Sequence, residues 1–386
     1  MLFLLYAYPG FVTHEAADHL FYSRLDEFID WQSPVLVELW RLSEWALGGP
    51  FGMLLVQSLL LLCGTFSITR KQVGDRAGAW IAVAMLLVPP LLATNAVIGV
   101  EAQLVAWLVA GLALLQSEKF SRRIGGLVML VVVVGLRSGG AAIALPIIVS
   151  TFVWRTPFTG WRRYAVALGA WAVTVLVAAG LSYALIDERT NRDELRLALS
   201  DVGGIHGDES IAEQIYSPVF FKGAETPEER DALFATRREL IRDNPGAYLS
   251  FRLHVFAQAL GVNKPKWWRP VFTDFVVTEN DSVMLAHAGR HSLVQRALIF
   301  PVKAMHATPL FWPICYLALA IGLLGVAIWR RLGLEIALLS AGLLYELTLA
   351  FTSFRPNYPD SHPMIATTLL AAFLLLGRRL RQSRDR

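Results

Sequence analysis

Long apolar runs alternate with short polar loops along most of this chain. Nine runs can be marked: 51–68, 79–97, 104–115, 127–136, 141–153, 164–186, 310–329, 332–351 and 364–376. Several approach or exceed the roughly 20 residues that cross a bilayer as a helix. Pro89-Pro90 falls inside the second run, where proline predicts a kink or a break. Residues 1–6 are apolar but too short to span, so we expect them to be the end of a truncated helix.

This pattern predicts an all-α polytopic membrane protein with about nine or ten transmembrane helices, the first one truncated. Residues 187–308 form a single long polar region with fifteen Lys/Arg and seventeen Asp/Glu. Helical stretches at 227–244 and 245–260 predict that this region is mostly helical. We therefore expect three parts: an N-terminal transmembrane module, 1–186, with a first outer loop at 8–50; an extracytoplasmic domain, 187–308; and C-terminal transmembrane helices with a basic cytoplasmic tail, 309–386.

Composition supports a membrane location. Hydrophobic residues make up 55% of the chain and charged residues 17%, against about 25% charged residues in soluble domains. Cys63 and Cys315 both lie in apolar runs, so they indicate neither a disulfide framework nor a metal site. The net charge of +4 does not indicate nucleic-acid binding, because the basic residues flank the apolar runs.

The basic residues also predict the orientation. With the N-terminus inside, the inner loops hold 16 Lys/Arg, in 70–78, 118–124, 154–163, 329–332 and 378–386. The short outer loops hold four arginines, Arg24, Arg41, Arg137 and Arg355. The positive-inside rule therefore places the opening loop and the 187–308 region outside the cytoplasm, with the protein in the plasma membrane.

The opening loop is the first candidate for chemistry. Glu15 and Asp18 lie three residues apart, on one face if Thr13 caps a short helix. Carboxylates next to apolar and aromatic surface can serve as general bases. The alternative is that they only stabilise the positive end of a helix. His14 and His19 show no metal-ligand pattern.

Four further residues are expected near the outer face. Glu101 begins an apolar run, where it either faces a site or extends to the interface. Arg137 precedes two glycines at a broken span, and arginine suits phosphate. Arg355 and Tyr358 share a later outer loop, where Arg355 could equally form a structural ion pair.

Two glutamates and a tryptophan pair give further expectations. Glu335, near an inner loop, is expected to be solvated, whereas Glu346 lies deeper in the membrane and needs a partner. Trp267-Trp268 favours an interfacial anchor over a platform for stacking a sugar.

The opening loop resembles a known superfamily. Tyr8-Pro9-Gly10, Glu15, Asp18, Asp30-Trp31-Gln32-Ser33-Pro34 and Leu39-Trp40 are similar to the first periplasmic loop of GT-C membrane glycosyltransferases. Protein mannosyltransferases and lipid A aminoarabinose transferases belong to this superfamily. Further segments also resemble it: Val100-Glu101, Leu136-Arg137, Asn244-Pro245-Gly246-Ala247-Tyr248-Leu249 with Arg252, and Phe354-Arg355 before Tyr358-Pro359.

The resemblance implies a GT-C-like fold and an inverting sugar transfer. The donor would be a polyprenyl-phosphate sugar, and the acceptor a glycan, a lipid or a protein. Glu15 or Asp18 would take a proton from the acceptor hydroxyl, with Glu101 and Tyr358 also lining the site. Arg137 or Arg355 would hold the phosphate. No cofactor is implied, and the need for a divalent metal stays open.

Two other functions stay open. One is an O-antigen polymerase or ligase, an envelope enzyme in which the large outer region is essential. The other is a transporter or a non-catalytic membrane protein, which is expected to carry paired ionisable residues near mid-membrane. The ionisable residues of this chain gather instead at the outer face, which argues against transport.

Overall fold

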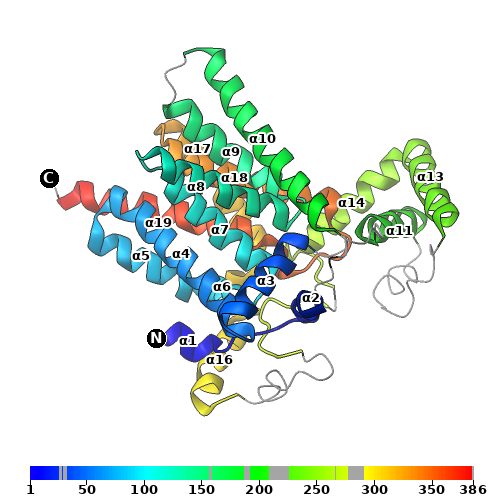
Figure 1. The fold of residues 1–386 in the computed structure, drawn as a ribbon, viewed down its shortest axis with the longest axis horizontal. Helices are drawn as coiled ribbons and strands as arrows, with labels where there is room; N and C mark the ends of the chain where they lie inside the picture. The colour runs from blue at the N-terminus through cyan, green and yellow to red at the C-terminus, as the bar shows by residue number, and fades with distance from the viewer. Residues whose placement is uncertain are drawn as a thin grey trace.

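The computed structural model of the chain is built from α-helices (Figure 1). It describes residues 1–25, 28, 33–155, 159–186, 192–207, 226–265, 267–276 and 291–384. Among these, the only β-type contacts are two isolated bridges. The helices are α1 Leu2–Ala7, α2 His14–Leu25, α3 Pro34–Ala46, α4 Pro50–Val73, α5 Asp75–Leu87, α6 Pro89–Asn95, α7 Val100–Leu115, α8 Phe120–Leu136, α9 Gly140–Arg155, α10 Trp161–Leu185, α11 Arg192–His206, α13 Pro227–Asp243, α14 Pro245–Ala259, α16 Leu293–Met305, η1 Pro309–Phe311, α17 Pro313–Trp329, α18 Gly333–Thr352, η2 Tyr358–Ser361 and α19 His362–Arg384.

Each of the nine apolar runs forms a helix, and the longest indicate a membrane protein. In the described part of the chain, four helical stretches are long and apolar enough to cross a bilayer: Pro50–Val73, Trp161–Leu185, Gly333–Thr352 and Tyr358–Arg381. The pair α5 and α6 passes the same test together, with a bend of 66°. Pro89 and Pro90 open α6 at this bend, as the sequence predicts. The apolar helices α7, α9 and α17 are shorter.

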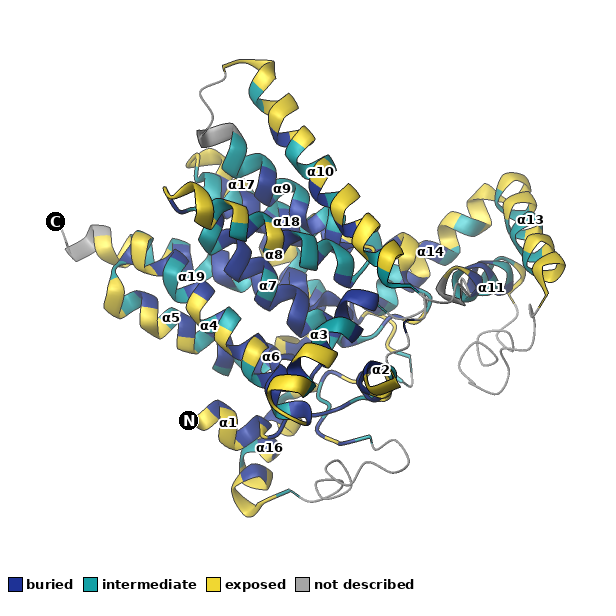
Figure 2. Cartoon of the chain, in the orientation of Figure 1, coloured by how far each residue is buried: buried dark blue, intermediate teal, exposed yellow. Residues whose placement is uncertain are grey.

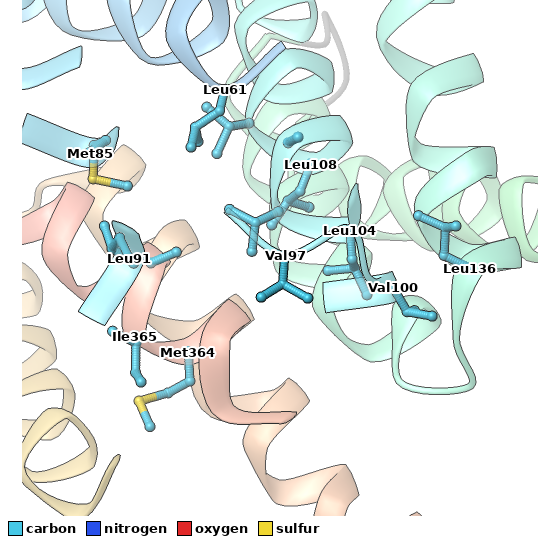
Figure 3. Close-up of a cluster of buried hydrophobic side chains, with 14 of the residues drawn as sticks. Leu61, Met85, Leu91, Val97, Val100, Leu104, Leu108, Leu136, Met364 and Ile365 are labelled. Carbon is cyan, nitrogen blue, oxygen red and sulfur yellow. The ribbon is translucent and has the colours of Figure 1, made fainter. Parts of the chain in front are cut away.

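Helix α7 lies at the centre of the bundle and is buried along most of its length. Small residues let its neighbours approach closely: a Cβ on Gly64 of α4 would lie 2.8 Å from the backbone nitrogen of Ala110. Leucine, valine and methionine side chains from α4, α5, α7, α8 and α19 fill the space around it (Figure 3). At the edge of the bundle, α10 exposes most of its apolar side chains (Figure 2).

The region 187–308 divides between two places. Helices α11, α13 and α14 pack on one another beyond one end of the bundle, whereas α16 packs on α1 (Figure 1). Asp201 of α11 joins the first group, because it binds Arg237 of α13 at 2.7 Å and Arg252 of α14 at 2.5 Å. Asp201 and Arg252 are almost completely buried. The Arg252 guanidinium also donates to the carbonyl oxygen of Ser353 at 2.8 Å, which connects this group to the end of α18.

The opening segment before α2 is anchored in the interior. The Phe11 amide donates to the carbonyl of Ala96, and the Ile98 amide donates to the carbonyl of Phe11, both at 2.9 Å. Val12 exchanges similar bonds with the segment 274–276. Both side chains are fully buried. This anchoring fixes the point at which α2 begins, close to the start of α7.

Candidate functional site

An arginine held between two carboxylates occupies the end of the bundle near α2. The Nη1 of Arg137 donates to Oε1 of Glu101, and its Nη2 donates to Oδ1 of Asp360 at 2.8 Å. The side chains of Arg137, Glu101 and Asp360 are 28%, 13% and 9% exposed. The three residues come from the break between α8 and α9, the first turn of α7, and η2. We call them the Arg137 cluster.

Local structure explains why Arg137 can reach both acids. Helix α8 ends at Leu136, and Arg137 has extended backbone angles, so its side chain leaves the helix axis. Gly140 then begins α9 with its amide bonded to the Arg137 carbonyl at 2.8 Å. A Cβ on Gly139 would lie 2.9 Å from the Tyr345 ring. The glycines therefore allow the tight turn that projects Arg137 outward.

Asp360 is a member of this cluster that was not predicted from the sequence. In η2, Asp360 and Asn357 cap each other, and Asp360 Oδ2 accepts from the Asn357 amide at 2.8 Å. Asn357 Oδ1 in turn accepts from the Arg269 amide at 2.9 Å. The spacing Asn-x-x-Asp is a capping pattern that the sequence does contain. The pairing of Asp360 with Arg137, 223 positions away, has no local signal.

Glu15 lies beside the Arg137 cluster. It is exposed in the first turn of α2 and interacts electrostatically with both Glu101 and Arg137. The Ala16 amide donates to the Thr13 hydroxyl at 3.2 Å, so Thr13 caps the helix as predicted. An accessible carboxylate thus lies beside a partly buried group of one cation and two acids.

Asp18 has different neighbours. Burial raises the pKa of its carboxyl above the ordinary value, and its electrostatic interactions with His19, His14 and Arg196 oppose that rise. His19 is buried, and its Nδ1 is 2.6 Å from the carbonyl oxygen of Glu15. Burial lowers the pKa of His19 to about 4, so the ring is neutral at pH 7. Asp18 is therefore half-buried and more easily protonated than a surface aspartate.

Arg355 lies in a second group near η2, which combines cations with aromatic rings. Arg355 is exposed and lies 5.9 Å above the Trp267 ring, and Arg196 lies 5.9 Å above the Phe354 ring. Lys264 lies 4.6 Å from the Trp268 ring and 4.9 Å from the Trp312 ring. We call these the basic-aromatic group: Lys264, Arg196, Arg355, Trp267, Trp268, Trp312 and Phe354.

Tyr358 lies in the interior beneath this group. Its side chain is fully buried, with ring centroids 5.6 Å from those of both Trp268 and Phe311. Its hydroxyl has no hydrogen-bond partner among the described residues. Trp268 is only 8% exposed, so the expectation that it anchors the chain at the membrane interface is wrong.

The structure identifies a partner for each of two deep carboxylates. The Ser361 hydroxyl donates to Glu346 Oε1 at 2.7 Å. Glu335 is fully buried and binds Arg378 at 3.0 Å, so the expectation that it is solvated is wrong. In the described part of the chain, no group of three His, Cys, Asp or Glu side chains has an arrangement that could hold a metal ion. Asp30, Trp31 and Gln32 lie outside the described residues.

Comparison of the chain with protein families, with curated proteins and with solved structures finds no match.

Proposed function

We propose that the protein is a membrane glycosyltransferase with a GT-C-like fold. It transfers a sugar from a polyprenyl-phosphate donor to a glycan, lipid or protein acceptor in the cell envelope, with inversion at the anomeric carbon. The observation that carries the proposal is the position of Glu15. This exposed carboxylate lies beside the Arg137 cluster, at the end of a bundle of apolar helices.

Glu15 acts as the general base. The acceptor hydroxyl attacks the anomeric carbon and loses its proton to the carboxylate, while the phosphate leaves from the opposite face of the sugar. Asp18 is the second candidate, because its raised pKa brings it closer to that of an effective base. Glu101 and Asp360 add negative charge around the site, which disfavours an anionic ligand there.

Arg137 orients the two acids, because both of its terminal nitrogens already bind carboxylates. Two carboxylates, those of Glu101 and Asp360, already bind its one positive charge, so a phosphate would have to displace one of them to bind there. Arg355 suits the phosphate better, because it is exposed and lies in the basic-aromatic group. Arg196 and Lys264 add positive charge on the same side.

The topology that suits this reaction has about nine or ten membrane crossings. The shorter helices α7, α8, α9 and α17 then cross together with the four long stretches and the bent pair. The basic loops face the cytoplasm, and α2, η2 and the α11–α13–α14 group face outward, in the plasma membrane. The donor enters laterally from the bilayer.

The test is sugar transfer in membranes that contain wild type, Glu15→Gln or Asp18→Asn. Extracted polyprenyl-phosphate donors with a radiolabelled sugar supply the substrate. Glu44→Gln is the matched control, because Glu44 is another acid near the outer end that binds Arg24 at 3.1 Å. We expect transfer to fall by about 10²–10⁴-fold in Glu15→Gln and to persist in the control. Unchanged transfer in both α2 variants would exclude Glu15 and Asp18 as the base.

A further inference from the structure

Helix α16 exposes an apolar face to the surroundings. Gln295, Ile299 and Val302 form its buried face, at the spacing i, i+4, i+7. On the other side, Leu293 is 84% exposed and Phe300 75% exposed. Ala297 and Ala304 lie next to Leu293 on the same side of the helical wheel. A surface helix that is apolar on both faces needs an apolar medium on its outer side.

Two cations lie along one edge of this helix. Arg296 and Lys303 are seven residues apart, so they share a stripe between the buried face and the outer face. Both side chains are exposed. Long basic side chains at the edge of an apolar helix place their charges in the headgroup layer of a bilayer. This arrangement is complementary to anionic lipid.

A cavity of about 450 Å³ opens between α16 and α1. Its lining is mostly apolar: Met1, Leu4, Leu5, Tyr8, Pro9, Phe275, Ser292 and Gln295. The Gln295 amide nitrogen donates to the carbonyl oxygens of Tyr6 and Tyr8, at 3.0 and 3.1 Å, so the backbone already binds it. The Ser292 hydroxyl caps α16 by accepting a hydrogen bond from the backbone amide of Gln295 at 3.1 Å. The lining therefore suits a hydrocarbon better than a polar ligand.

We propose that this cavity binds one acyl chain of an anionic phospholipid, whose phosphate lies at Arg296 and Lys303. Ser292 lines the cavity and Arg296 is one helical turn further on, which brings this cation to the rim. The volume is at the lower end of the range for ligand sites, about 300–1,000 Å³, and suits a single chain. The site is independent of sugar transfer.

The test uses the full chain in nanodiscs of phosphatidylglycerol that carries a photoreactive group midway along one acyl chain. Cross-linked residues are mapped by mass spectrometry. We expect labelling to concentrate at Leu4, Leu5 and Phe275, above the level at Leu176, an exposed apolar residue of α10. Leu5→Trp fills the cavity and should reduce labelling there to the Leu176 level. Leu176→Trp is the matched control and should leave it unchanged.

A second arm tests the headgroup. Arg296→Gln and Lys303→Gln should each lower labelling by phosphatidylglycerol about fivefold and leave labelling by phosphatidylcholine unchanged. Arg330→Gln, an exposed cation at the far end of α17, is the control. Equal labelling of α10 and the cavity in wild type would overturn the proposal. Labelling by a photoreactive polyprenyl phosphate, without labelling by phospholipid, would also overturn it and assign the cavity to the donor.

Discussion

Removal of the Arg137 guanidinium should destabilise the fold strongly. In Arg137→Gln, Glu101 and Asp360 lose their shared cation while they stay 13% and 9% exposed. Breaking a buried ion pair by removing one partner costs about 3–5 kcal/mol. Because the Arg137 side chain is 28% exposed, water screens part of this effect, and we take the lower end, about 3 kcal/mol.

A double-mutant cycle isolates the pairing. The free energy of unfolding is measured in mixed micelles for wild type, Arg137→Gln, Asp360→Asn and the double variant. The double variant no longer buries an unpaired Asp360 charge, so it should be more stable than the sum of the single effects by about 1–3 kcal/mol. Arg137→Lys keeps the positive charge but lacks the two terminal nitrogens that bind the two acids. Its free energy of unfolding should lie between those of wild type and Arg137→Gln.

The opposite result would change the role of Arg137. If the single effects add within about 0.5 kcal/mol, the guanidinium and Asp360 do not stabilise each other. If, in addition, Arg137→Gln is as stable as wild type but loses inhibition by inorganic phosphate in the transfer assay, the residue is a phosphate ligand. Arg137 would then not serve to hold the two carboxylates.

Three further predictions follow from buried groups. Asp201→Asn leaves the buried Arg252 without its carboxylate partner. It should lower the free energy of unfolding by about 3 kcal/mol, measured by denaturation in micelles. The pKa of His19 is lowered from 6.5, its ordinary value, to about 4 in the folded protein, so between these two pH values only the unfolded chain takes up the proton. The free energy of unfolding should therefore fall by about 3 kcal/mol as the pH drops from 6.5 to 4. His19→Gln should remove this part of the pH dependence. Gly64→Ala brings a Cβ to 2.8 Å from the α7 backbone and should cost about 1–3 kcal/mol, whereas Gly169→Ala, with open space around it, should cost nothing measurable in the same denaturation assay.

The sequence predicted the local features of the fold because they depend on neighbours along the chain. All nine apolar runs are helices, Thr13 caps α2, and the two prolines produce the 66° bend. Each of these results needs only periodicity, a capping side chain or a missing amide. Membrane character was equally accessible, since it is a property of composition.

Contacts between distant segments could not be predicted in this way. Glu335 binds Arg378, 43 positions later, and lies in the interior instead of in water. Asp360 reaches Arg137 only because η2 lies where α8 ends and α7 begins. Within 187–308, no composition boundary separates α16 from the other helices. Such pairings depend on how helices pack, and a single sequence carries little information on packing.

The loop between α18 and α19 connects the two halves of the proposed site. Arg355 belongs to the basic-aromatic group, and Asp360, five positions later, belongs to the Arg137 cluster. Arg252 holds the start of this loop through Ser353, and the mutual cap of Asn357 and Asp360 fixes its end. Inversion needs a base on one face of the sugar and a stabilised leaving group on the other. In the proposed reaction the base is Glu15, beside the Arg137 cluster, and Arg355 stabilises the leaving phosphate. A short loop fixed at both ends keeps Arg355 at a constant separation from that cluster.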